Sequence, residues 1–340
     1  MDIQGAIRRV IDRRDLDEAE MAEVMTAIMS GAATPSQIAG LLVGLRMKGE
    51  TVAEITAAAR VMRRLAVPVA TPFADLVDIV GTGGDASGTF NISTACAFVA
   101  AAAGARVAKH GNRAASSRSG SADLLEAAGV AVDLEPDQIA RCIGEVGVGF
   151  MFAPRHHGAM RHAMGPRREL AVRTLFNLLG PLTNPAGATR LMLGVFDAQW
   201  VEPIAQVAGR LGARHALVVH ADDGMDEISI SSATQVAEYE NGAVRCYTIR
   251  PEQFGIARCE RERVCVQDAA QSKAVIDAVF AGERGPARDI VLLNAGAALY
   301  VAGIGADIGS GIAMAARAID GGGAREKLAA LAALTRSMHA

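Results

Sequence analysis

A glycine-rich turn stands between a short apolar run and an apolar helix. Gly81-Thr82-Gly83-Gly84-Asp85 follows the run 76–80, and Asn91-Ile92-Ser93-Thr94 opens the helix. Glycines let backbone amides approach an anion, and the helix N-terminus adds free N–H donors. This arrangement favours a phosphate-binding loop, although a tight strand-to-helix turn would also explain the glycines. The turn has neither the Walker A pattern nor the dinucleotide-binding pattern.

A second loop concentrates cations, hydroxyls and small residues. It runs from Lys109 to Asp123 and follows the predicted strand 105–108. Such side chains suit a ligand with several phosphates, and ligand sites in α/β proteins lie at the carboxyl ends of strands. A solvated surface turn would also be polar, but this density of donors at a strand end favours a binding function.

An acidic loop follows the predicted strand 216–220. Its sequence is Asp222-Asp223-Gly224-Met225-Asp226-Glu227. Carboxylates at a strand end can hold Mg²⁺ together with waters and join it to a substrate phosphate. Acidic loops are usually only solvated, so this loop indicates a metal site only in combination with the two loops before it.

The elements that must position these loops divide into two kinds. Over the first seventy residues apolar positions recur at helical spacing, which predicts four helices. Thr34-Pro35 supplies an N-cap and a first-turn proline, and Thr51 with Glu54 forms a capping-box pattern. The segment 67–72 contains two prolines and is the predicted linker.

Beyond the linker, short apolar runs alternate with helices, as in a parallel sheet covered on both faces. Asn241-Gly242 is a strong hairpin signal, so part of the sheet is expected to be antiparallel. The predicted strands are 76–80, 105–108, 130–133, 149–153, 191–196, 216–220, 236–239 and 244–249.

Composition, net charge and cysteine spacing exclude several classes of protein. With 51% hydrophobic but only 4% aromatic residues, the 340-residue chain is typical of a helix-rich α/β enzyme rather than a β-sandwich. Its net charge of −3 does not indicate sequence-independent binding to nucleic acid. The N-terminus has no secretory pattern and the five cysteines form no Cys-x-x-Cys pair, so we expect a cytoplasmic protein with reduced thiols.

Taken together, the order and spacing of these motifs resemble the anthranilate phosphoribosyltransferases. The resemblance runs along the whole chain and includes the segments 81–85, 91–94, 109–121, 152–154, 173–182 and 184–185, the pair Asp226-Glu227, and Leu293-Asn294-Ala295-Gly296. It implies transfer of the 5-phosphoribosyl group from phosphoribosyl pyrophosphate (PRPP) to the amine of anthranilate, with Mg²⁺, two ions per subunit.

The resemblance also implies an α/β fold with a small N-terminal helical domain and a large α/β domain whose central sheet is mostly parallel, with helices on both faces. The helical domain is expected to comprise residues 1–70, with roughly 165–188 returning to it, and to form a homodimer. Residues 71–164 and 189–340 would form the domain that binds PRPP and Mg²⁺. No nucleic acid or membrane is expected as a partner.

By the same resemblance, PRPP is surrounded by residues of the first two loops: Gly81, Gly84, Asp85, Thr89, Asn91, Ile92, Ser93, Thr94, Lys109, Ser117, Ser119, Gly120 and Ser121. Ser93, Asp226 and Glu227 are the implied metal ligands. The implied anthranilate contacts are Gly81, His110, Asn112, His157 and Arg167. No general base is assigned, because the aryl amine is already nucleophilic and positioning by Lys109, His110 and Arg167 should matter more.

The chain departs from the family pattern near the acceptor site. Gly158 replaces a proline, Gly165-Pro166-Arg167 replaces Pro-Val-Arg, and Ala171 stands where glycine is expected. Two alternatives are a pyrimidine-nucleoside phosphorylase of the same fold and a nucleic-acid-binding, non-catalytic paralogue. Asp226-Glu227 and Lys109-His110-Gly111-Asn112 argue against the first, and the net charge argues against the second.

Overall fold

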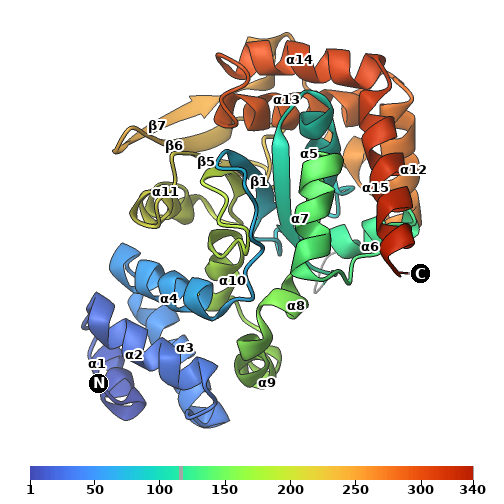
Figure 1. Ribbon diagram of the computed structural model, residues 1–340. Coiled ribbons are helices and arrows are strands. Elements are labelled where there is room, and N and C mark those ends of the chain that lie inside the picture. The colour runs from blue at the N-terminus through green and yellow to red at the C-terminus, as the bar shows by residue number, and fades with distance from the viewer. Residues whose placement is uncertain (115–117, 340) are drawn as a thin grey trace.

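A seven-stranded sheet forms the centre of the larger part of the molecule in the computed structural model, which describes residues 1–114 and 118–339 (Figure 1). The strand order is β3-β2-β1-β4-β5-β6-β7, with β1 to β5 parallel and β6 and β7 antiparallel. The bounds are β1 Leu76–Gly81, β2 Arg106–Gly111, β3 Val148–Phe152, β4 Arg190–Gly194, β5 His215–Ala221, β6 Thr234–Glu240 and β7 Ala243–Ile249. The predicted mixed sheet and the hairpin at Asn241-Gly242 are confirmed.

Helices cover both faces of the sheet and form a separate bundle. They are α1 Ile3–Ile11, α2 Glu18–Met29, α3 Pro35–Lys48, α4 Val52–Leu65, α5 Ile92–Ala102, α6 Ser121–Ala127, α7 Pro136–Glu145, α8 Ala153–His156, α9 Arg161–Leu170, α10 Leu175–Leu179, α11 Val201–Arg210, α12 Ala269–Phe280, α13 Pro286–Val301, α14 Ile308–Asp320 and α15 Gly323–His339. Short 3₁₀ turns occupy Gly158–Met160, Gly180–Leu182, Ala198–Trp200, Pro251–Phe254 and Arg261–Val264.

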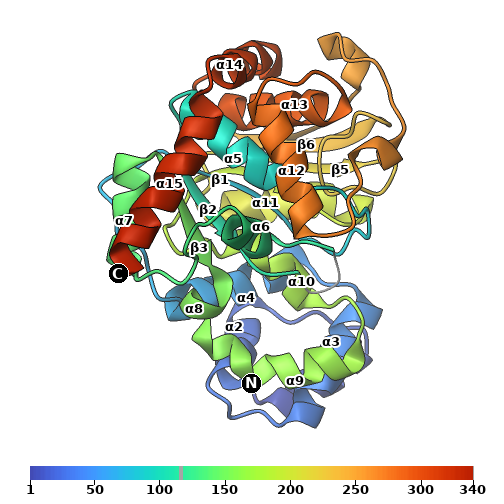
Figure 2. The ribbon, with the colours of Figure 1, turned by 90° about the vertical axis from the view of Figure 1, so that its right-hand side faces the viewer.

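The strands alternate between two apolar cores, as side chains on a pleated strand must. Leu217 and Val219 of β5 face the core built with α5 and α13, whereas Val218 belongs to a core shared with α11 and the helical bundle. Figures 1 and 2 show α1–α4 with α9 at one end of the molecule and the sheet with α12–α15 at the other. The second core therefore joins the bundle to one face of the sheet.

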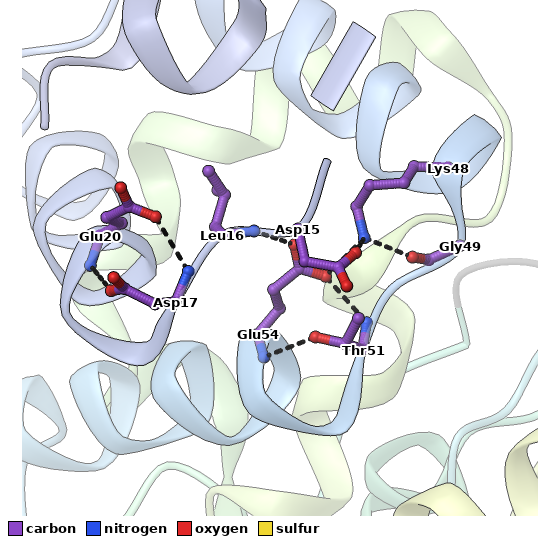
Figure 3. Close-up of polar contacts among 8 residues, drawn as sticks. All are labelled: Asp15, Leu16, Asp17, Glu20, Lys48, Gly49, Thr51 and Glu54. Carbon is purple, nitrogen blue, oxygen red and sulfur yellow. Dashed lines mark hydrogen bonds and ion pairs between the residues drawn. The ribbon is translucent and has the colours of Figure 1, made fainter. Parts of the chain in front are cut away.

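The predicted start of the bundle helices is confirmed in detail. Thr34 and Thr51 both form capping boxes, with Gln37 and Glu54 respectively. Glu54 also holds the α1–α2 connection, because its Oε1 accepts the Leu16 N–H at 2.9 Å (Figure 3). The Lys48 ammonium lies 3.0 Å from Glu54 Oε2, so the fully buried carboxylate is paired. This cluster ties three helix ends together.

The chain returns to the bundle after β3. Helix α9 packs against α2 and α3, and α10 packs against α3 and α4. Leu175, Leu179 and Leu182 are buried in the bundle's core. These contacts place the segment that should carry Arg167 on the bundle side of the molecule.

The predicted strand 130–133 is wrong. Val130, Val132 and Leu134 are buried in alternation, which mimics a strand, but these residues form no ladder. The Ala131 N–H instead donates to Thr335 Oγ1 of α15 at 3.1 Å. The segment is thus an extended connection that packs beneath a helix, and a burial pattern alone cannot distinguish it from a strand.

None of the helices among the described residues is long and apolar enough to cross a membrane.

Candidate functional site

The three predicted loops follow β2, β1 and β5 of one parallel array, in which β4 lies between β1 and β5. The glycine turn leaves β1 after Gly81 and the acidic loop leaves β5 after Ala221. The second loop leaves β2 after Gly111, because β2 extends beyond the expected end at 108 and includes Lys109. Carboxyl ends of parallel strands share one edge of the sheet, which is where α/β proteins bind ligands. The topology therefore brings all three loops to one place.

The glycine turn and the acidic loop are in direct contact. Gly83 donates its backbone N–H to Asp226 Oδ2 at 2.8 Å. A Cβ on Gly81 would overlap the Asp226 carboxylate, and one on Gly194, at the end of β4, would overlap the Asp226 carbonyl oxygen. Glycine at these two strand ends is what lets the acidic loop lie across the sheet edge.

Three acids gather at this contact. The Asp226 N–H lies 3.5 Å from Asp85 Oδ2. Burial, and then the charge of Asp85, raise the pKa of Asp226 to about 7. Burial and the charge of Asp226 also raise the pKa of Glu227 well above its ordinary value, although Lys109 opposes this. Carboxylates that repel one another at low exposure are a donor set that suits a hard cation such as Mg²⁺.

Lys109 lies beneath the glycine turn. Its side chain is almost fully buried, and its ammonium donates to the Ile79 carbonyl at 2.6 Å and to Ser93 Oγ at 3.2 Å. Burial lowers the pKa of Lys109, while the charges of Asp78 and Glu227 counteract that effect. Lys109 thus supplies a positive charge beside the acids and orients Ser93 at the start of α5.

The start of α5 is tied to the second loop. Asn91 Nδ2 donates to the Ser119 carbonyl at 3.1 Å, and Ser119 Oγ donates to Asn91 Oδ1 at 2.8 Å. Thr94 Oγ1 donates to Ser121 Oγ at 3.1 Å. The structure therefore brings together residues that were singled out in two separate motifs.

Ser272 of α12 completes this cluster and was missed in the sequence. Its hydroxyl donates to Asn91 Oδ1 at 2.7 Å and accepts the Asn91 N–H at 3.0 Å. The side chain is fully buried. Asn91 and Ser272 are 181 residues apart, and no local pattern marks a lone serine in a helix as the partner of a distant loop.

The remaining residues expected near PRPP lie along the same two loops. Gly84 has a φ of +73°, Asp85 accepts the Ser87 N–H at 3.3 Å, and Thr89 forms a β-bridge with Cys265. Ile92 is buried, and a Cβ on Gly120 would overlap the backbone at Ala114. Ser117 lies outside the described residues.

On the acceptor side, His110 and His157 form a pair with ring centroids 5.1 Å apart. His110 Nδ1 lies 3.2 Å from the Gly180 carbonyl oxygen. Burial lowers the pKa of His110 to about 3 and that of His157 to about 4, so both rings are neutral near pH 7. Both Nε2 atoms are buried without a hydrogen-bond partner among the described residues, and such unpaired buried polar atoms are uncommon outside functional sites.

The other two side chains expected to contact anthranilate, Arg167 and Asn112, lie on other elements. Arg167 of α9 is half-buried, with its guanidinium 5.3 Å from the centre of the Phe176 ring, and burial lowers its pKa. Arg168 is exposed, as expected for a surface charge. Asn112 is exposed and its Oδ1 accepts the Arg113 N–H at 2.8 Å. Within the described part of the chain, no hydrogen bond joins Arg167 or Asn112 to the histidine pair.

The family departures have distinct structural settings. Gly158 opens a 3₁₀ turn, and a Cβ added there would meet no atom within 4 Å, so a side chain would fit. Pro166 lies inside α9 and is buried. Ala171 ends α9 in the left-handed conformation with a φ of +50°, which glycine adopts more readily.

Arg173 is a second residue whose role the sequence did not reveal. Its guanidinium donates to the Gly84 carbonyl and lies 4.4 Å from the centre of the Phe196 ring. It therefore joins the segment after α9 to the glycine turn. Its place in the motif 173–182 was visible in the sequence, but its partner was not.

A further group of metal-ligating side chains lies away from these loops. His215, Glu238 and Glu240 place one ligand atom each within 4.8 Å of one another. Glu238 already accepts hydrogen bonds from His215 at 2.9 Å, Arg245 at 2.8 Å and Tyr300 at 2.6 Å. Burial acts to raise the pKa of Glu238, but these bonds hold it at about 2. The group is a saturated structural cluster rather than a second cation site.

Family models match both parts of the chain. The a/b domain model of a glycosyl transferase family matches residues 74–325, and the helical bundle domain model matches residues 4–66. Anthranilate phosphoribosyltransferases of Thioalkalivibrio sulfidiphilus and Alkalilimnicola ehrlichii are 63% and 60% identical to the chain. Each alignment covers 99% of this chain and 100% of the relative.

Solved structures agree with this match. The crystal structure of anthranilate phosphoribosyltransferase from Thermus thermophilus is 45% identical, with a TM-score of 0.92, over 97% of this chain and 99% of that one. The Saccharomyces cerevisiae enzyme in complex with PRPP and Mg has the same fold at 24% identity, with a TM-score of 0.90, over 98% of each chain. The expected two-part fold is thereby confirmed, and the phosphorylase and nucleic-acid-binding alternatives are not favoured. The chain belongs to the anthranilate phosphoribosyltransferase family.

Proposed function

We propose that this chain binds PRPP and Mg²⁺ at the carboxyl ends of β1, β2 and β5 and transfers the 5-phosphoribosyl group to the amine of anthranilate, releasing pyrophosphate. The observation that carries the assignment is the contact between Gly83 and Asp226. At this contact a backbone that can bind phosphate meets carboxylates that can bind a divalent cation. Structures of a yeast enzyme of the same fold have been solved in complex with PRPP and Mg and in complex with 4-fluoroanthranilate.

Asp226 and Glu227 are the proposed Mg²⁺ ligands, with Ser93 contributing near the pyrophosphate. When bound, the metal neutralises charge that develops on the leaving pyrophosphate. The raised pKa values of both acids support the assignment, because a cation would relieve the repulsion that raises them. Two ions per subunit remain the expectation.

PRPP contacts are assigned to the glycine turn, the start of α5 and the second loop. Backbone amides at Gly81, Gly84 and Asp85 and the N-terminus of α5 supply donors to phosphate oxygens. Lys109 contributes a positive charge, and its ammonium donates a hydrogen bond to Ser93 Oγ. The other proposed contacts are Thr89, Asn91, Ile92, Thr94, Ser117, Ser119, Gly120 and Ser121.

Positioning, rather than a general base, is the proposed role of the acceptor residues. The neutral His110 and His157 are too weakly basic at a pKa of about 3 and about 4 to remove a proton efficiently. They can instead shape the pocket and hydrogen-bond through their free Nε2 atoms. Arg167 would hold the anthranilate carboxylate, and Asn112 and Gly81 would complete the pocket.

Three further expectations stay predictions: the homodimer formed through the helical domain, the cytoplasmic location, and the division into 1–70 with roughly 165–188, and 71–164 with 189–340. The contacts of α9 and α10 with the bundle support the last of these.

Calorimetry with PRPP tests the proposal directly. PRPP should bind with Mg²⁺ present and much more weakly after chelation, because the acids and the phosphates otherwise repel one another. Binding that is indifferent to Mg²⁺ would contradict the assignment. Phosphorolysis of thymidine, measured in parallel, would support the phosphorylase alternative instead.

A further inference from the structure

The acidic loop must hold two mutually repelling carboxylates in a fixed direction. Part of that task is done by residues outside the loop: the hydroxyl of Ser229, just after it, donates to Asp223 Oδ2 at 2.6 Å. Arg261 donates to the Asp223 carbonyl at 3.1 Å. These bonds act at the first half of the loop, and the Gly83 N–H holds the Asp226 carboxylate, so the backbone that carries Glu227 must be fixed from elsewhere.

Asn294 of α13 contacts the chain directly after that pair. Its Oδ1 accepts the Ile228 N–H at 2.8 Å, and its Nδ2 donates to the Ile228 carbonyl at 2.8 Å and to the Ile290 carbonyl at 2.9 Å. Asn294 is fully buried and Ile228 is 1% exposed. The side-chain amide thus pairs with both backbone groups of Ile228, as a neighbouring strand would.

This pairing fixes the orientation of Glu227. The Ile228 N–H belongs to the peptide that joins Glu227 to Ile228, and the Ile228 carbonyl belongs to the next peptide. Holding both groups at once restricts rotation of the backbone on each side of Ile228. The direction in which Glu227 leaves the chain is set by the first of these peptides.

Helix α13 is a firm base for this contact. Gly296, two residues after Asn294, packs against α14 so closely that a Cβ there would lie 2.7 Å from the Ile312 nitrogen. Sites held by rigid helices keep their geometry better than sites held by loops alone. The motif Leu293-Asn294-Ala295-Gly296 therefore combines a clamp on the acidic loop with close helix packing.

We propose that Asn294 is a positioning residue for the metal site: by clamping Ile228 it orients Glu227 and Asp226 for Mg²⁺. The inference rests on the proposed metal role of these two acids. An amide is required because it offers a donor and an acceptor in one plane. Aspartate would present only acceptors to the Ile228 and Ile290 carbonyls, and serine would be too short to reach both groups of Ile228.

Asn294→Asp and Asn294→Ser test the proposal, with Leu299→Ala as the control. Leu299 is fully buried on the same helix, five residues further along, so its truncation destabilises α13 while the side chain that forms the hydrogen bonds to Ile228 stays in place. Serine keeps a hydroxyl for the Ile290 carbonyl and serves if the aspartate variant does not fold. Thermal melting gives the stability of each variant.

The deciding readout is Mn²⁺ binding followed by electron paramagnetic resonance, together with the Mg²⁺ concentration that half-saturates PRPP binding in calorimetry. Loss of a residue that orients metal ligands should weaken metal binding about ten- to hundredfold. We expect that shift in the Asn294 variants and none in Leu299→Ala, with the KM for anthranilate unchanged at saturating Mg²⁺. Equal metal affinity in Asn294 and Leu299 variants of equal melting temperature would overturn the proposal.

Glu227→Gln separates this outcome from failure of the proposed function. If Glu227→Gln weakens Mn²⁺ binding and the Asn294 variants do not, the metal site stands and the clamp is only structural. If Glu227→Gln also leaves Mn²⁺ binding unchanged, the metal assignment itself is wrong.

Discussion

Gly83 and Asp226 are 143 residues apart, yet the N–H of the first donates to the carboxylate of the second at 2.8 Å. The bond joins the loop proposed for phosphate to the loop proposed for metal. Gly83 has a φ of +66° and is exposed, so the bond lies at the surface of the sheet edge with the N–H directed at Asp226. Substrate and metal would meet at this one peptide.

Gly83→Val should weaken PRPP binding far more than anthranilate binding. A branched side chain is strained at a φ of +66° and would stand where phosphates must approach. Gly187→Val is a matched control. Gly187 has the same φ of +66° and the same open surroundings, but it lies just before β4, at the amino ends of the parallel strands.

Calorimetry with PRPP, compared with the melting temperatures, separates backbone strain from obstruction of PRPP binding. Both variants should lose similar stability from backbone strain, while only Gly83→Val should lose PRPP affinity. Normal PRPP affinity in Gly83→Val would mean that the phosphate-binding loop lies elsewhere.

Asp226→Asn should stabilise the metal-free protein at neutral pH. The pKa of Asp226 rises from an ordinary 3.8 to about 7 in the folded chain, so its contribution to stability is complete below about pH 3.8 and lost as pH rises through about 7. The melting temperature of Asp226→Asn should therefore exceed that of the unaltered chain increasingly from pH 4 to pH 7.

Asp222→Asn, at an exposed acid of the same loop, controls for the loss of one negative charge. With Mg²⁺ present the unaltered chain should melt at a higher temperature than Asp226→Asn, because the metal stabilises only the chain that binds it. A melting difference that does not change with pH would show that Asp226 ionises normally.

Arg167→Ala should raise the KM for anthranilate strongly and change PRPP binding little. A charge-assisted hydrogen bond to a carboxylate contributes about 1.5–3 kcal/mol, or roughly ten- to hundredfold in affinity. Arg168→Ala is the matched control, since Arg168 is the exposed neighbour on α9. If Arg168→Ala gave the large defect in steady-state kinetics, the assignment of the carboxylate contact would be displaced by one residue.

Ala171→Gly should stabilise the protein by about 1 kcal/mol, because a left-handed alanine carries a steric cost that glycine avoids. The matched control is Ala128→Gly, at the end of α6, where the φ of −85° suits alanine and glycine should be destabilising. Urea denaturation should thus give opposite signs. A loss of stability in both variants would contradict the left-handed end of α9.

The features that depend on a few neighbouring residues, or on the general rule for parallel sheets, were predicted correctly. The N-cap at Thr34, the capping box at Thr51, the hairpin at Asn241-Gly242 and the convergence of three loops at strand ends all follow from signals a few residues long or from the rule for parallel sheets. The segment 130–133 failed because alternating burial also arises in an extended connection that hydrogen-bonds to Thr335.

Partners contributed by distant parts of the chain could not be predicted. Ser272, Arg173 and Asn294 contact the site through single side chains, and each partner is 66 to 181 residues away in sequence. The resemblance marked the segments that contain Arg173 and Asn294 but assigned neither a role. The low pKa values of His110 and His157 were likewise invisible, because they result from burial that only the packed chain produces.

Phosphoribosyl transfer to anthranilate is measured by the fluorescence of anthranilate, followed with the unaltered chain and with the double variant Asp226→Asn, Glu227→Gln. We expect that the unaltered chain consumes the signal only when PRPP and Mg²⁺ are both present, and that the folded double variant loses this activity or needs far more Mg²⁺. A signal that persists with the complete mixture, or a folded double variant with unchanged Mg²⁺ dependence, would contradict it.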